Sequence, residues 1–369
     1  MTFMLVFAMT LGGLTPVMAV SPESVTTTLS AKNEGGDNDH SPVVLVSWAA
    51  RENGWSDDSD AAYSQILPSG VHEEHTTIRI CTIATDPDGL DDIDNVYTRI
   101  YYPDNIALGD HHNPLPGQSG DGCGLQMQQD ELGKLGKSEG YNLFCNHIRN
   151  NNHNLPEWEG ASDYDEICGE EQVLQKETAA VWCYEKEISY EDPSGYYEVE
   201  IDVRDDHGPG AIHEFGFDYL PLTAFEIDFD SIDYGTVKTG TQKIISGDRT
   251  FDPEDDRATV RNVGNTRLGM GVEQSDMGLG YTSSNSNATF KARIGSDASW
   301  THYSPSFDTG WTERKWIDNH LDLSEANEMD FGITVHKFPV HTDYTGEMVL
   351  SGRSVDHLEC YTPCALEDC

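Results

Sequence analysis

The chain has 369 residues, with 22 lysines and arginines against 65 aspartates and glutamates, which gives a formal charge of −43. A surface with this charge repels nucleic acids and anionic membranes, so neither is an expected partner, and cations are favoured. The length predicts two or three domains, each large enough to bury a hydrophobic core.

The first segment of the chain predicts export. Residues 1–19 are apolar and end in Val17-Met18-Ala19, a small-x-small pattern typical of signal-peptidase sites, although no lysine or arginine precedes the apolar run. We therefore expect a signal peptide that is cleaved or kept as an anchor. No later stretch is apolar over the roughly 18 residues that a membrane helix needs. The rest of the chain is expected to be extracellular, at a cell surface or in a cell envelope.

The period of the apolar residues predicts an all-β protein. Residues 20–42 are rich in small polar residues and are expected to be a linker or an exchangeable arm that donates a strand. The clearest strand is Tyr197–Val203, where apolar and charged residues alternate. Residues 43–222 are predicted to form an antiparallel β-sandwich with a long cysteine-containing insertion at 103–176, and residues 223–350 a second sandwich.

Eight cysteines, an even number, are expected to form disulfides in an exported chain. Cys81 and Cys183 fall on predicted strands, where facing positions bring two cysteines within bonding reach. Five cysteines belong to the first predicted unit and three to a cysteine-rich tail, residues 351–369. Either a bond joins the tail to that unit, or some bonds join neighbouring molecules. The eight residues are Cys81, Cys123, Cys145, Cys168, Cys183, Cys360, Cys364 and Cys369.

Five segments resemble a known class of proteins. They are IDFDSIDYGTVKTG at 227–240, TVRNVGN at 259–265, DYTGEMVLS at 343–351, TDPDGLDDI at 85–93 and the predicted strand at 197–206. These segments resemble immunoglobulin-like domains of archaeal surface proteins, with methanogen S-layer and sheath components as the nearest comparison. The resemblance implies two tandem immunoglobulin-like sandwiches and a subunit that assembles with copies of itself without catalysing a reaction.

One acidic turn predicts a metal site. Five aspartates between residues 86 and 94 surround Gly89, and a calcium ion takes several oxygen ligands of this kind. Asp205, at the end of a later strand, is expected to complete the set. The alternative is a plain hairpin turn, because Asp and Gly favour turns on their own account. The candidate ligands are Asp86, Asp88, Asp91, Asp92, Asp94 and Asp205.

Two functions remain open for such a chain. Asn287-Ala-Thr289 is an N-glycosylation acceptor sequence, and no metalloprotease, hydrolase or phosphate-binding motif predicts an enzyme. The first function is a self-assembling structural subunit of an extracellular surface layer, sheath or filament, joined by edge strands, disulfides or calcium. The alternative is a monomeric surface adhesin or glycan-binding protein that recognises cell-envelope glycans through the insertion loops.

Overall fold

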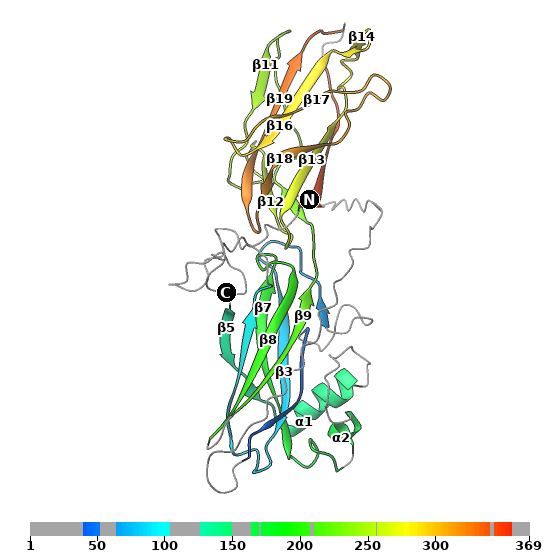
Figure 1. The fold of residues 1–369 in the computed structure, drawn as a ribbon. Helices are drawn as coiled ribbons and strands as arrows, with labels where there is room; N and C mark the ends of the chain where they lie inside the picture. Colours follow the sequence, from blue (N-terminus) through cyan, green and yellow to red (C-terminus); the bar gives the residue numbers. More distant parts are fainter. Residues whose placement is uncertain are drawn as a thin grey trace, which may run out of the picture.

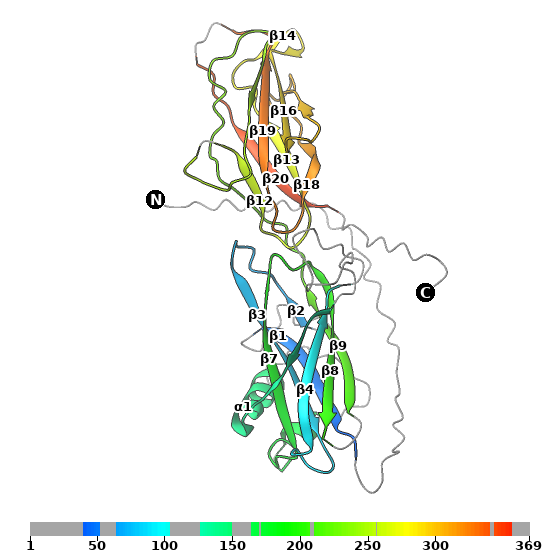
Figure 2. The same cartoon turned by 90° about the vertical axis from the view of Figure 1, so that its left-hand side faces the viewer.

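The fold is known from a computed structural model, which is described for the following parts of the chain. These are residues 40–51, 64–103, 126–149, 164–169, 171–206, 210–255, 257–339 and 343–355. They form a largely β structure of two units placed end to end (Figures 1 and 2). The predicted signal peptide, nearly all of the predicted arm and most of the predicted tail lie outside the described residues.

The first unit is a β-sandwich of two sheets. Its strands are β1 Val43–Arg51, β2 Ser64–Ile66, β3 His75–Thr85, β4 Ile93–Tyr101, β5 Gln126–Glu131, β6 Gly133–Lys134, β7 Ala179–Ser189, β8 Gly195–Asp205 and β9 Ala211–Tyr219. The first sheet has the order β1-β3-β7-β6 and the second β2-β9-β8-β4-β5. Neighbouring strands are antiparallel, apart from β2, which runs parallel to β9.

Alternation along the strands builds the core between these sheets. In β8, Tyr197, Val199, Ile201 and Val203 are fully buried, while Glu198 and its alternate neighbours face outward. Successive side chains of a strand point to opposite faces, so a period of two gives one apolar face. The strand predicted at this place is therefore confirmed.

A helical layer covers the outer face of the first sheet. It consists of helix α1 Lys137–Tyr141, π-helix η1 Asn142–Arg149 and helix α2 Tyr164–Cys168. Phe144 of η1 packs on Trp48 of β1 with ring centroids 5.2 Å apart, inside a second small core. Part of the predicted insertion at 103–176 thus belongs to the sandwich itself, because it supplies β5, β6 and this layer. None of the described helices has the length and apolar character needed to cross a membrane.

The second unit is also a sandwich, with different strand pairing. Its strands are β10 Phe225–Ile227, β11 Gln242–Ile245, β12 Thr259–Asn262, β13 Leu268–Gln274, β14 Tyr281–Thr282, β15 Asn285–Ser286, β16 Ala288–Ile294, β17 Thr301–Tyr303, β18 Lys315–Leu321, β19 Ala326–Val335 and β20 Met348–Ser354. One sheet has the order β10-β12-β19-β16-β17, with β11 also on β19, and the other is β18-β13-β20. Phe290 and Phe331 lie in its core.

Asn265 connects the two units. Its buried side chain donates to the carbonyl of Leu220 at 3.0 Å and accepts from the N–H of Leu222 at 2.7 Å. Its own carbonyl accepts from the N–H of Ser194, in the turn before β8, at 3.0 Å. A Cβ on Gly264 would lie 2.3 Å from the Leu222 carbonyl oxygen, so only glycine fits there. These contacts fix the second unit against the turn between β7 and β8.

Candidate functional sites

The predicted acidic turn joins β3 to β4. The N–H of Asp88 donates to Oδ1 of Asp86 at 2.7 Å, and the N–H of Gly89 donates to the Asp86 carbonyl at 3.2 Å. Gly89 has a φ of 128°, which L side chains rarely adopt. The Asp-Pro-Asp-Gly sequence therefore closes the turn by itself. The turn lies at the end of β8 that is remote from the second unit, because the start of β8 adjoins the junction.

Three carboxylates converge in this turn. One oxygen each of Asp86, Asp88 and Asp92 lies within 4.8 Å of the others. Asp86 is only 5% exposed, and its buried Oδ2 has no hydrogen-bond partner in the described part of the protein. Burial is the largest cause that raises the pKa of Asp86. The hydrogen bond from the Asp88 N–H lowers this pKa, and the negative charges of Asp205, Asp88 and Asp92 raise it further. A divalent cation would supply the missing positive charge.

His40, which precedes β1, is an unforeseen neighbour of the turn. Its N–H donates to Oδ2 of Asp88 at 2.6 Å, and its Nδ1 lies 3.1 Å from the same oxygen. These hydrogen bonds hold the pKa of Asp88 below its usual range, and the one from the His40 backbone N–H has the largest effect. The contact spans 48 residues, so no local pattern in the sequence signals it.

The structure gathers only part of the predicted ligand set. Asp91 and Asp94 are exposed and lie outside the group of three, and Oδ2 of Asp94 accepts from the Asn95 amide at 2.5 Å. Asp205 is near enough to act on the pKa of Asp86 without joining the group. The Asp206 N–H donates to the Asp92 carbonyl at 2.9 Å, which ties the end of β8 to the turn.

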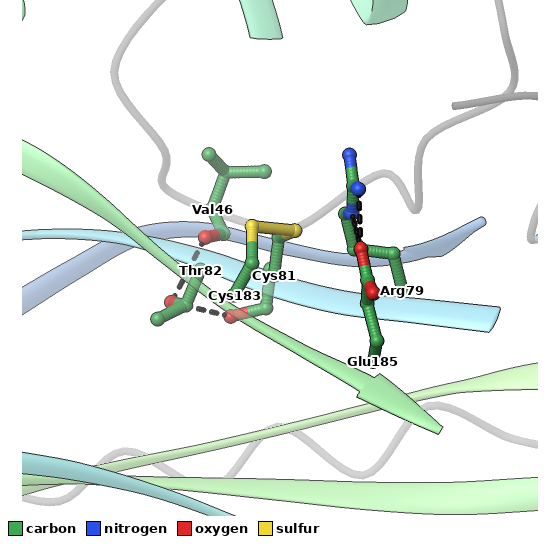
Figure 3. The surroundings of a disulfide bond; sticks show 7 residues. Val46, Arg79, Cys81, Thr82, Cys183 and Glu185 are labelled. Carbon is green, nitrogen blue, oxygen red and sulfur yellow. Dashed lines mark hydrogen bonds and ion pairs between the residues drawn. A yellow bond between two sulfur atoms is a disulfide. The ribbon is translucent and has the colours of Figure 1, made fainter. Parts of the chain in front are cut away.

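Two disulfides brace the first unit. Cys81 of β3 and Cys183 of β7 face each other and are bonded, with Cα atoms 4.2 Å apart, as their strand positions predict (Figure 3). Cys145 of η1 is bonded to Cys168 of α2, which holds the helical layer together. Figure 3 also shows the ion pair of Arg79 with Glu185 beside the first bond. The other four cysteines, Cys123, Cys360, Cys364 and Cys369, lie outside the described residues.

The predicted glycosylation acceptor, Asn287, lies in the interior of the second unit. It is 6% exposed, and its Nδ2 donates to the Leu279 carbonyl at 2.9 Å. Its Oδ1 accepts from the Thr282 hydroxyl at 2.7 Å. The nitrogen that a glycan would modify therefore lies inside the fold, and glycosylation of Asn287 stays a prediction. The acceptor sequence is local, whereas the burial depends on the tertiary fold.

No protein-family model and no curated protein matches the chain. It is similar to the C-terminal domain of the Streptococcus agalactiae antigen I/II polypeptide BspA, at 12% identity and TM-score 0.23, covering 85% of this chain and 96% of that chain. It is also similar to the C-terminal domain of the Streptococcus pyogenes antigen I/II-family protein AspA. The identity is 14% and the TM-score 0.23, and the match covers 84% of this chain and 95% of that chain.

A third solved structure has a still lower score. It contains carbohydrate-binding modules of the β-sandwich superfamily, at 9% identity and TM-score 0.18, covering 88% of this chain and 100% of that chain. Scores of this size carry no argument about function. None of these matches bears on the resemblance to archaeal surface proteins, which stays a prediction.

Proposed function

We propose that the protein is an extracellular, adhesin-like surface protein that binds partners through a rod of two β-sandwich units and catalyses no reaction. The observation that carries this proposal is the end-to-end arrangement of the two sandwiches, joined through the buried Asn265 (Figure 2). Such a rod extends its far end away from an anchoring surface. Two disulfides in the first unit suit an oxidising, external location.

Strand pairing supports an immunoglobulin-like fold for the first unit. Its sheets, β1-β3-β7-β6 and β2-β9-β8-β4-β5, follow the strand order of immunoglobulin sandwiches. The hydroxyl of Tyr197, near the start of β8, donates to the Pro193 carbonyl at 2.8 Å, as in the tyrosine corner of that fold. In the second unit β13 lies between β18 and β20, so its pairing supports a sandwich of another order.

Charge favours the adhesin over the self-assembling subunit. Copies that each carry a formal charge of −43 repel one another when they pack closely, so a lattice would need many bridging cations. Sedimentation of the purified chain, with calcium and with chelator, tests this point. We expect monomers in both, together with saturable binding of labelled protein to cell envelopes that unlabelled protein competes away. Ordered sheets or filaments in electron micrographs would instead establish the structural subunit.

We also propose that Asp86, Asp88 and Asp92 bind calcium. The buried, unpartnered Oδ2 of Asp86 supports this, because a lone carboxylate oxygen in the interior is costly without a cation. Calcium at about a hundred times its dissociation constant would stabilise the fold by about 2.7 kcal/mol. We expect calcium to raise the melting temperature, Asp86→Asn to remove the effect and the exposed Asp94→Asn to keep it. Equal responses of the two variants would contradict the site.

A further inference from the structure

A groove of about 680 Å³ opens on the first unit, on the side where the edges of the two sheets face each other. Its lining includes Tyr184 and Glu187 of β7, Met127 of β5 and Tyr102, which follows β4. The Tyr184 hydroxyl bonds to Asp130 of β5, and burial and this bond raise the pKa of Tyr184 to about 12. The hydroxyl therefore stays protonated and links β7 of one sheet to β5 of the other.

Among the described residues, none covers the edge of strand β7 along this groove. Its neighbour β6 has two residues and pairs only with Cys183 and Trp182, whereas β7 continues to Ser189. Cys81 and Cys183 form a close pair, with Cα atoms 4.2 Å apart, the spacing of a pair without mutual backbone hydrogen bonds. The N–H and C=O of Cys183 thus point away from β3.

The same alternation exposes the backbone of Glu185 and Glu187. Every second residue of β7 directs its N–H and C=O away from β3, as the Val181 carbonyl does in accepting from the Leu135 N–H at 2.8 Å. Ser189 is already satisfied, since its N–H donates to Asp192 and its carbonyl accepts from the Tyr219 hydroxyl. Within the described parts of the chain, no backbone group pairs with Glu185 or Glu187 on this side. Such an edge is a template for another strand.

The charge of the groove selects the kind of strand. Four carboxylates line it against one lysine, and Arg79 pairs with one of the four, Glu185. In an added strand, the residues opposite Glu185 and Glu187 would share their outer face, where basic side chains are favoured. The alternate residues would face Tyr184 and Met127, where apolar side chains fit. The predicted arm, residues 20–42, has four acidic residues and one lysine, so its charge does not complement the acidic groove.

We propose that this groove binds an extended peptide segment of a partner protein, with alternating basic and apolar residues, which adds to the first sheet as a strand beside β7. The backbone groups of Glu185 and Glu187 supply the hydrogen bonds, and the acidic rim supplies the selectivity. The inference rests on the proposed adhesive function, because it assigns that function a partner class and a place on the protein.

The first test uses three synthetic peptides and the full chain. The probe is a fluorescent heptapeptide of alternating lysine and valine, and binding is measured by fluorescence anisotropy. One control carries N-methyl groups on the amides that would face β7, and the other has glutamate for lysine. We expect saturable binding of the probe and at least about tenfold weaker binding of both controls, since each lost hydrogen bond contributes about 1 kcal/mol. Equal binding of the methylated peptide would overturn the inference, because attraction by charge alone would then explain the binding.

The second test compares two variants with the same change of charge. Glu187→Lys alters the groove, and Glu214→Lys alters an exposed position of β9 in the other sheet. We expect Glu187→Lys to weaken probe binding about tenfold and Glu214→Lys to change it by less than about twofold. The probe should also slow hydrogen exchange at the Glu185 and Glu187 amides. Equal effects of the two variants would overturn the inference that the peptide binds in the groove. If Glu187→Lys weakens probe binding but still binds cell envelopes, the proposed adhesive function remains supported.

Discussion

Removal of the Cys81–Cys183 disulfide should lower the stability of the first unit by several kcal/mol. The bond joins residues separated by 102 positions, and restricting a loop of about a hundred residues in the unfolded chain is worth about 4.7 kcal/mol. In the folded state β3 and β7 stay paired along eleven residues, so the double variant Cys81→Ala/Cys183→Ala keeps its strand register. The effect should therefore arise mainly in the unfolded chain.

The second disulfide provides a matched control. Cys145 and Cys168 are separated by 23 positions, for which the same expression gives about 3.4 kcal/mol. Both bonds lie in the small core beneath the helical layer, so the two double alanine variants lose similar packing. Urea unfolding without reductant, followed by circular dichroism, gives both free energies of unfolding. The long-loop variant should be less stable than the short-loop variant by about 1.3 kcal/mol.

The reverse order would refute the reasoning from loop length. If the Cys145→Ala/Cys168→Ala variant were the less stable one, the attachment of the helical layer to the sheet would outweigh the length of the closed loop. Near-ultraviolet circular dichroism separates the two causes, because Phe144 packs on Trp48 beneath that layer. A lost aromatic signal with an intact far-ultraviolet spectrum would show that the layer detaches while the sandwich persists.

Three further predictions concern single side chains. The pKa of Asp86 is higher in the folded than in the unfolded chain, so its contribution to stability is greatest at acid pH and is lost as the pH rises through the raised value. In chelator, Asp86→Asn should therefore raise the melting temperature at neutral pH, and an unchanged pH profile would contradict this. Tyr197→Phe removes the bond to the Pro193 carbonyl and should cost about 1 to 2 kcal/mol in urea unfolding, and an unchanged free energy of unfolding would contradict this. Asn265→Ala removes two bonds at the junction, and small-angle scattering should then show a wider spread of angles between the units; an unchanged profile would contradict this role.

The features that the sequence predicts are local ones. The strand at Tyr197–Val203 follows from a period of two, which depends only on the residues themselves. The pattern also places Cys81 and Cys183 on strands, but that they face each other across 102 positions depends on the register of β3 with β7. The acidic turn follows from Asp and Gly, which close it through their own backbone and side chains.

The features that the sequence does not predict depend on distant neighbours. The helical layer is stable because Phe144 meets Trp48, a residue almost a hundred positions earlier. Asn287 has the acceptor pattern of a glycosylation site, but the fold buries it and its side chain bonds to Leu279 and Thr282. The groove exists because β6 ends after two residues, and no pattern within β7 shows where a neighbouring strand stops.

The acidic turn and the groove have a common electrostatic origin. Most arginines of the described residues already pair with carboxylates on the sheets, as Arg99 does with Glu200 and Arg293 with Asp330. With 65 acidic side chains against 22 basic ones, the surplus must remain where no arginine reaches. The turn and the rim near Glu187 are two places in the described structure where carboxylates lie close together. At both places a bound cation or a basic segment of another protein would reduce the repulsion between neighbouring carboxylates, as proposed above. Binding at both places should weaken as salt shortens the screening length, more steeply at the exposed rim than at the buried turn.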